Sequence, residues 1–275
     1  MPYAGAMLWI ISALALGFFA VERLWPANEL PRVDGWWARV VLVNLLQLGI
    51  VTLTGLAWHR WLAPYSLFHL AAKNRALANG LIAYLFSTFV YYWWHRYRHE
   101  SQFFWRLCHQ LHHSARRIEI VTSFYKHPVE ILLNALLSSL LIYFLLGCTP
   151  SAAAFCALLA TVAEFFYHWN IGTPRWLGFI VQRPESHRIH HQFRRHTHNF
   201  ADLPIWDALF GTLKNALVSP ARCGFDPERE RRFEEMLAFR DVHAARRAVS
   251  FPLLPTCLGC RKRWACIGAR SRLAS

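Results

Sequence analysis

Charged side chains are scarce in this 275-residue chain, where they make up 17% of the residues against 55% hydrophobic ones, including 13 Trp and 20 Phe. An ordinary soluble domain carries about 25% charged residues. The composition therefore argues against a soluble domain and predicts an all-α integral membrane bundle, because helices satisfy their own backbone hydrogen bonds in lipid.

Basic residues are absent from the start of the sequence. The first 21 residues carry no charge, and Glu22 is the first charged side chain. A secretory signal peptide opens with a basic stretch and ends in a small-residue cleavage site. We therefore expect residues 1–21 to be an uncleaved membrane anchor.

Acidic residues are outnumbered, 16 against 30 basic ones, which gives a net charge of +14. Residues 95–275 hold 24 of the 30 Lys and Arg and 13 of the 15 His. No nucleic-acid-binding motif accompanies this charge, so we expect no nucleic-acid partner. Basic segments beside membrane spans are typical of the cytoplasmic face, next to anionic lipid.

Paired cysteines are also lacking. The chain has seven Cys, an odd number, and Cys148 and Cys156 lie in apolar runs, so no disulfide framework is expected. Cys257 and Cys260, with Cys266 nearby, resemble half of a zinc site. No second pair of ligands follows, so we do not predict structural zinc there.

Long uncharged runs are abundant by contrast. A helix needs about 20 apolar residues to cross ~30 Å of hydrocarbon. Four runs qualify by length: residues 1–21, 40–58, 76–94 and 131–163.

The fourth run is too long for one straight span. Gly147-Cys148-Thr149-Pro150 interrupts it, which predicts a helical hairpin. A hairpin returns the chain to the side from which it started, so residues 95–128 and 168–215 should share one face of the membrane, the cytoplasmic one. Residues 59–76 should then lie on the opposite side or in the interface, although they include Arg60 and Arg75.

Histidines are concentrated in three short motifs near the ends of these runs. On a helix, positions i, i+3 and i+4 share one face, so each motif directs its imidazoles together. Eight imidazoles suffice for two metal ions with open positions, but imidazole suits iron, copper, zinc and nickel alike. The motifs are His95-Arg-Tyr-Arg-His99, His109-Gln-Leu-His112-His113 and His187-Arg-Ile-His190-His191.

An all-histidine site at a membrane face suits two iron ions with room for O2, and such a site can oxidise the unactivated C–H bonds of a lipid. The main alternative is a histidine-lined metal transporter, whose ligands should lie at mid-membrane. A membrane cytochrome would need haem ligands on facing helices within the bilayer. Both alternatives predict ligands inside the spans rather than after them.

The order of these motifs, together with the segment Asn199-Phe-Ala-Asp-Leu-Pro-Ile-Trp-Asp-Ala-Leu-Phe-Gly-Thr212, resembles the fatty acid hydroxylase/sterol desaturase superfamily. Lys126-His127-Pro128 and His168-Trp169-Asn170 also match its pattern. The resemblance covers about residues 40–215. These would be the catalytic domain, with residues 1–39 as membrane anchor and loop and 216–275 as a basic cytoplasmic tail.

The resemblance implies a membrane-bound non-haem di-iron oxidoreductase that uses O2 to hydroxylate or desaturate a lipid of the sterol or fatty acyl type. It would need two iron ions, a lipid substrate from the bilayer and electrons from a separate partner, a ferredoxin, cytochrome or reductase. The implied metal ligands are His95, His99, His109, His112, His113, His168, His187, His190 and His191.

Carboxylates that accept hydrogen bonds from metal-bound imidazoles are expected nearby. Glu164, four residues before His168, is one candidate, and Asp202 is another. Asp207 would either support a ligand or cap a helix or a turn. His127 would either support the site or order the turn before Pro128.

Two further expectations concern the last third of the chain. His196 and His198 follow the third motif closely, and we assign both to the surface. Asp226-Pro227-Glu228 has the pattern of a helix N-cap, and the helix should run to about Val249.

Overall fold

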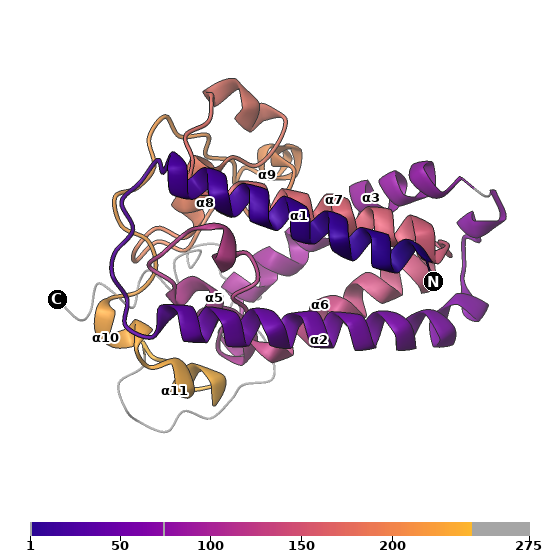
Figure 1. The fold of residues 1–275 in the computed structure, drawn as a ribbon, viewed down its shortest axis with the longest axis horizontal. Helices are drawn as coiled ribbons and strands as arrows, with labels where there is room; N and C mark the ends of the chain where they lie inside the picture. The colour runs from indigo at the N-terminus through magenta and orange to yellow at the C-terminus, as the bar shows by residue number, and fades with distance from the viewer. Residues whose placement is uncertain (1, 74, 244–275) are drawn as a thin grey trace.

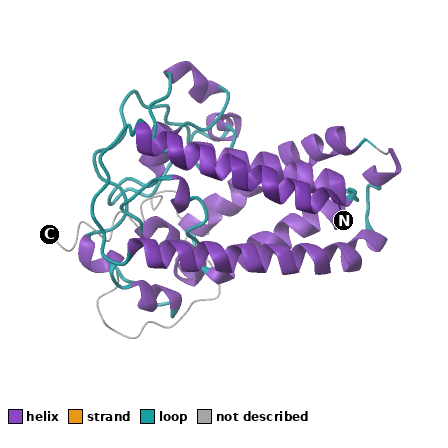
Figure 2. Ribbon diagram, in the orientation of Figure 1, coloured by secondary structure: helices purple, strands orange, loops and turns teal. Residues whose placement is uncertain are grey.

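The computed structural model describes residues 2–73 and 75–243. All regular elements in these ranges are helices, and the one pairing of extended backbone is an isolated bridge between Gln192 and Cys223 (Figure 2). The predicted all-α class is confirmed for this part of the chain. Figure 1 shows the long helices running side by side, with most of the short helices, α5 and α8 to α11 among them, gathered at the end away from the N-terminus.

The long elements are α1 (Pro2–Leu24), α2 (Trp36–Leu62), α3 (Ala76–Glu100), α6 (Pro128–Ser139) with its π-helical continuation η5 (Leu140–Leu145), and α7 (Pro150–His168). The short elements are η1 (Ala63–Tyr65), η2 (Leu70–Lys73), α4 (Gln102–Phe104), the π-helix η3 (Trp105–His109), α5 (Gln110–Ser114), η4 (Ile120–Thr122), η6 (Arg175–Phe179), α8 (Pro184–His190), α9 (Pro204–Leu209), α10 (Pro227–Glu230) and α11 (Phe233–Leu237).

The predicted hairpin is formed by α6, η5 and α7. Gly147 adopts a left-handed conformation with φ 64°, which a residue with a side chain rarely takes. Pro150 then opens α7, and the Thr149 side chain caps it by accepting the backbone N–H of Ala152. The break that the sequence placed here is confirmed.

The tip of the hairpin is closed by the segment between η1 and η2. Backbone N–H groups of Leu67, Phe68, Leu70 and Ala71 donate to successive carbonyls of residues 144–147, at 2.8–3.0 Å. These carbonyls end a helix and would otherwise lack partners. The segment 59–76 therefore lies at the hairpin tip, at the opposite end of the bundle from the histidine motifs (Figure 1).

Among the described residues, three helical stretches are long and apolar enough to cross a membrane by length and composition: Trp36–Tyr65, Pro128–Leu145 and Pro150–His168. The expected spans at 1–21 and 76–94 also form helices, α1 and α3, but are not among these three. One face of α3 is buried against the hairpin through Ala83 and Tyr84, which reduces the apolar surface that it needs.

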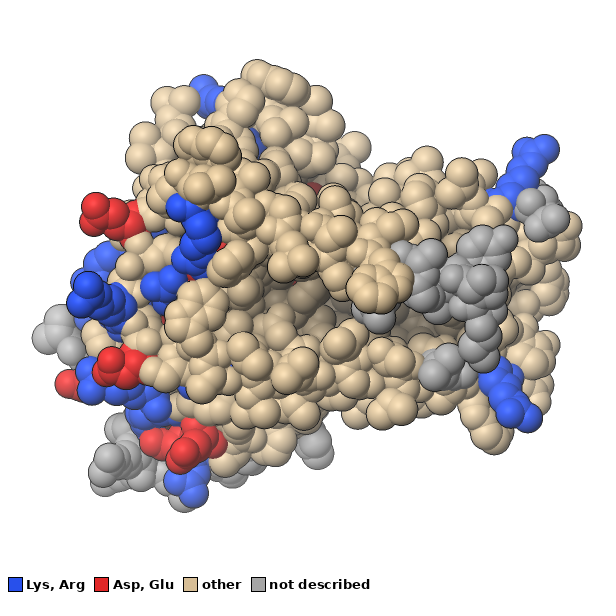
Figure 3. Space-filling model, in the orientation of Figure 1, with Lys and Arg blue, Asp and Glu red and all other residues tan. Residues whose placement is uncertain are grey.

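The surface has the pattern of a membrane protein. Large apolar side chains are exposed along the long helices, among them Trp9 at 79%, Leu16 at 70% and Leu53 at 70%. In Figure 3 a broad uncharged band separates many charged residues at the end with the short helices from a few at the other end. A soluble surface would not leave such a band exposed; the chain is an integral membrane protein.

The short helices other than η1 and η2 form a cap over the end of the bundle. The cap has its own core, in which Trp36, Trp105 and Tyr125 pack against Phe225 and Met236. Residues 216–243 thus contribute to the cap.

The N-cap at Asp226 is confirmed, since its carboxylate accepts the N–H of Arg229. A single helix to Val249 is wrong for the described residues, because the backbone breaks after Glu230 and resumes as α11. The break lets Met236 turn into the core, and positions after 243, including Cys257 and Cys260, lie outside the described residues.

The N-terminal helix is fastened to the cap by a buried carboxylate. Glu22, 2% exposed, accepts the backbone N–H groups of Ile120 at 3.0 Å and Asn170 at 3.2 Å. Asn170 also hydrogen-bonds Asn28, and the Trp169 indole donates to the carbonyl of Phe18 at 2.7 Å. Residues 1–39 are therefore integrated with the segment that follows α7.

Replacing Glu22 by Ala should destabilise the protein, because two buried N–H groups lose their acceptor at a cost of roughly 1–3 kcal/mol each. The measurement is the thermal unfolding midpoint in detergent. Glu29→Ala, at an exposed position on the following loop, is the matched control and should leave the midpoint unchanged. Equal midpoints for the two variants would contradict the fastening role.

Candidate metal centre

The histidine motifs lie where the long helices end and the cap begins. His95 and His99 occupy the last two turns of α3, and His168 is the last residue of α7. The second motif spans the change from the π-helix η3 to α5, and the third lies in α8 and its C-cap. All three motifs, distant in sequence, meet at this end of the bundle.

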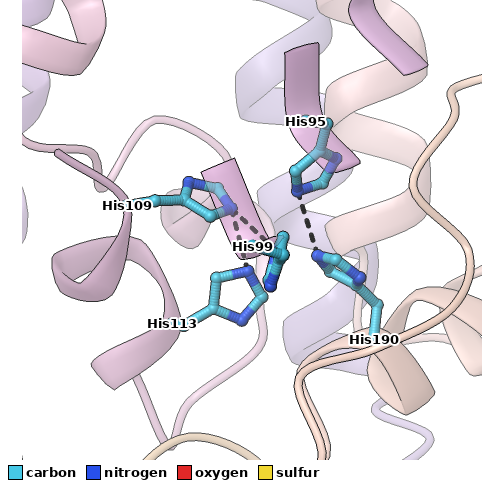
Figure 4. A group of neighbouring side chains, drawn as sticks. All are labelled: His95, His99, His109, His113 and His190. Carbon is cyan, nitrogen blue, oxygen red and sulfur yellow. Dashed lines mark hydrogen bonds between the residues drawn. The ribbon is translucent and has the colours of Figure 1, made fainter. Parts of the chain in front are cut away.

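The nine predicted residues form two groups. Within each group, every histidine has a ring nitrogen that lies within 4.8 Å of those of the others. The first group is His95, His99, His109, His113 and His190; the second is His112, His168, His187 and His191. Figure 4 shows the first group, with five rings converging on one point from three parts of the chain.

Each H-x-x-H-H motif divides its residues between the two groups. In the second motif, His109 and His113 join the first group and His112 joins the second. In the third motif the assignment is reversed, because His190 joins the first group. The i, i+4 pairs stay together and the i+3 residue crosses over, so the two groups are interlocked. A single shared direction for each motif, as the spacing suggested, is therefore wrong.

Several of the outer ring nitrogens contact backbone carbonyls. The Nδ1 atoms of His95 and His190 donate to the carbonyls of Phe200 and His198, both at 2.7 Å. His112 is similarly placed against the carbonyl of Tyr125, at 3.3 Å. Such contacts fix the tautomer and the ring orientation, and they are typical of metal-ligating histidines.

The Nε2 atoms of His95 and His190 face each other, and neither carries a proton. Because a carbonyl only accepts, Nδ1 of His95 and of His190 must carry the proton, and each neutral ring has a bare lone pair on Nε2. These two Nε2 atoms lie 3.0 Å apart. Two lone pairs at this distance repel unless a cation lies between them, so the donor set fits a metal ion.

Burial keeps these rings neutral. It lowers the pKa of His190 to about 3, and it holds the pKa values of His109, His112, His187 and His191 well below their ordinary range, with neighbouring positive charge adding to the effect. Neutral imidazole is the form that binds metal.

Glu130, a buried carboxylate that the sequence analysis missed, lies next to the first group. Glu130, fully buried in the first turn of α6, lies 3.2 Å from Nδ1 of His109 and also pairs with Arg98. The pattern was visible, since Glu130 is a lone acidic residue at the start of an apolar helix.

Glu164 is near the second group, but the hydrogen bond to His168 comes from its backbone. Nδ1 of His168 lies 2.9 Å from the Glu164 carbonyl. The Glu164 carboxylate instead binds Nζ of Lys126 at 2.5 and 2.7 Å and accepts from the hydroxyl of Tyr167 at 2.9 Å. Asp202 also contacts this hydroxyl, at 3.2 Å.

Asp207 acts on the site through the loop before α9. Its two carboxylate oxygens accept the backbone N–H groups of Phe200 and Ala201, at 2.8 and 2.9 Å, and the hydroxyl of Thr212 donates to it at 2.7 Å. The loop so held presents the Phe200 carbonyl to His95. Asp207 therefore caps the turn before α9, and its contact with the site is indirect, through this loop.

Two further histidines, His127 and His196, were also assigned roles from the sequence. His127 lies outside both groups and caps α6, where its Nδ1 accepts the N–H of Val129 at 3.1 Å. The surface assignment of His196 is wrong: it is 4% exposed, and its Nδ1 lies 3.1 Å from Nδ1 of His113. The turn after α8, with Arg194 and His198 at positive φ, folds His196 back under the site.

Polar side chains from the long helices line a small cavity beside the two groups. Its volume is about 50 Å³, enough for a few water-sized groups. Its wall combines histidines of both groups with Tyr91, Arg98, Lys126, Asn134, Glu164, Tyr167 and Asp202.

Residues 80–212 match the family described as fatty acid hydroxylase. Human alkylglycerol monooxygenase is 32% identical over 139 residues, which are 48% of this chain and 30% of that protein. The ornithine lipid hydroxylase OlsE of Rhizobium tropici is 28% identical over 139 residues, 49% of this chain and 41% of its own length. A very-long-chain aldehyde decarbonylase of rice is 33% identical over 150 residues, 49% of this chain and 24% of that protein.

The match thus covers less than half of the length of each of these relatives. No solved structure matches this chain.

Without metal, the stability of the protein should fall in mild acid. Folding lowers the pKa of the buried histidines below 6.5, so the unfolded chain binds more protons below that pH. The stability is present above about pH 6.5 and lost as the pH falls, by up to about 1.4 kcal/mol per histidine and pH unit. The unfolding midpoint of chelator-treated protein, measured in detergent from pH 7.5 to 5.5, tests this; a flat profile would refute it.

Proposed function

We propose that this chain, whose residues 80–212 match the fatty acid hydroxylase family, is a membrane-bound non-haem di-iron enzyme that uses O2 to oxidise a lipid. The observation that carries the proposal is the convergence of nine histidines in two interlocked groups at the ends of membrane-crossing helices. Relatives named as a monooxygenase and a hydroxylase favour insertion of oxygen.

The proposed reaction is hydroxylation. A C–H bond of the lipid, O2, two electrons and two protons give a C–OH group and water. Bound iron would supply the reductive activation of O2. The electrons would come from a separate redox protein, a ferredoxin, cytochrome or reductase, approaching the cap; desaturation of the same lipid is the variant reaction.

The chain's own residues orient the ligands and exclude water. The five-histidine group would hold one iron ion and the four-histidine group the other. Carbonyls of Phe200, His198 and Glu164 bind Nδ1 of His95, His190 and His168, which directs the Nε2 lone pairs of these three rings inward. Glu130 stabilises the proton on Nδ1 of His109.

Position along the helices argues against the transporter. Transport ligands should lie at mid-membrane, whereas the histidines of α3 and α7 lie in their last two turns. The site is at the depth of a membrane surface, which a lipid reaches from the bilayer.

His112→Ala tests the metal assignment. It removes one imidazole from the four-histidine group, so bound iron should fall from two ions per chain toward one and turnover should be lost, while the protein still inserts. Iron is measured on purified protein by elemental analysis. His59→Ala, at the far end of α2, is the matched control and should keep both ions. Full occupancy in His112→Ala would refute the assignment.

We further propose that the cap faces the cytoplasm, on the strength of its basic charge. The test uses a chain with its native cysteines replaced and a single Cys at exposed Arg194 in the cap or exposed Arg60 at the other end. A membrane-impermeant maleimide added to intact cells should label Arg60→Cys and spare Arg194→Cys. The reverse pattern would place the cap outside.

A further inference from the structure

A patch of large apolar side chains is exposed on the cap, outside the long helices. It is formed by η6 and α9, which contact each other. Exposed apolar surface of this extent marks a place where a protein meets a partner or a membrane. The members of this η6/α9 patch, each at least 58% exposed, are Trp176, Phe179, Ile180, Ile205 and Leu209.

The interior behind η6 is polar. Arg183, 1% exposed, donates to the carbonyls of Thr173 at 2.7 Å and Ala216 at 2.9 Å and to the side-chain oxygen of Asn215 at 2.7 Å. It also pairs with Glu185 at 3.1 Å. Polar groups therefore hold η6 from within while its apolar side chains face outward. A domain surrounded by water has the opposite arrangement, with its charged groups outside.

The level of α9 along the bundle places the patch beside the lipid-facing helices. The Trp206 indole donates to the hydroxyl of Thr88 at 2.9 Å, and its ring packs against Phe89 with centroids 5.0 Å apart. Thr88 lies seven residues before His95 on α3, which is about 10 Å toward the hairpin tip at 1.5 Å per residue. At its contact with α3, α9 is therefore deeper in the membrane than this ligand of the metal centre.

The surface around the patch continues the apolar band of the bundle. In Figure 3 the lobe that carries α9 in Figure 1 is almost free of charge and runs into the uncharged band of the long helices. The exposed charged side chains of residues 171–182 and 203–214 are Arg175 and Lys214, both basic. Basic residues at such an edge suit lipid phosphates, and tryptophan is enriched at the same level of a membrane. Continuity and charge both favour lipid over a protein partner.

We propose that the η6/α9 patch is inserted into the bilayer leaflet on the side of the cap. Its apolar side chains then lie about 5–10 Å below the boundary between headgroups and acyl chains, as in other surfaces that enter one leaflet. The cap is partly embedded instead of standing clear of the membrane. The inference concerns contact with lipid, so it holds whether or not the protein oxidises one.

The test uses the full chain with its native cysteines replaced, labelled with an environment-sensitive fluorophore at a single Cys and reconstituted in phosphatidylcholine vesicles. Phe179→Cys and Leu209→Cys probe the patch. Leu53→Cys, exposed on the membrane-crossing α2, is the control for lipid, and Arg194→Cys, on the exposed turn after α8, is the control for water. Quenching is measured with iodide in the buffer and with lipid that carries a nitroxide near the top of its acyl chain.

We expect the nitroxide lipid to quench both patch labels within about twofold of the Leu53→Cys label, and iodide to quench them at least about fivefold less than the Arg194→Cys label. Iodide quenching equal to that of Arg194→Cys would overturn the inference. Protection from both quenchers would overturn it as well, because protein, such as a second copy of this chain, would then cover the patch.

Trp176 gives a second readout without a label. The fluorescence that is lost in Trp176→Phe is the contribution of this side chain, and brominated phosphatidylcholine should quench at least about half of that contribution. Trp25→Phe, at an exposed position just after α1, is the matched substitution for the size of the change in fluorescence. A Trp176 contribution that brominated lipid leaves unquenched would contradict the insertion.

Discussion

Nine imidazoles gathered beside one small cavity, most of them shut off from water, are the constraint on which the rest of the structure depends. Each ring must be neutral and must turn a bare nitrogen inward, so its other nitrogen needs an acceptor outside the group. Backbone carbonyls supply this acceptor for four rings, those of His95, His112, His168 and His190. The irregular course of the chain around residues 198–200, with its positive φ angles, follows from that need.

Sequence alone predicted the parts of this arrangement that depend on local pattern. Helical spacing identified the three motifs, and Gly147 and Pro150 located the hairpin that brings His168 back to the other histidines. Asp226 was recognised as a cap because its role depends only on residues within one turn.

What sequence could not predict depends on contacts between distant segments. The group that an imidazole joins depends on ring contacts between the second and third motifs, so the division of each motif between the two groups could not be predicted from the sequence. His196 was misplaced because its burial depends on a left-handed turn several residues away. The Glu164 carboxylate pairs with Lys126, 38 positions earlier. The hydrogen bond to His168 is therefore made by the Glu164 backbone carbonyl.

The buried Glu22 carboxylate shows that the segment similar to other proteins and the segment held together by contacts are not the same. Similarity to relatives begins at residue 80, yet Glu22 holds the backbone at Asn170, two residues after His168. The segment that the family comparison matches is therefore smaller than the part of the chain that these contacts join. A fragment cut at the similarity boundary would carry all nine histidines and still lack the support on which the last turn of α7 rests.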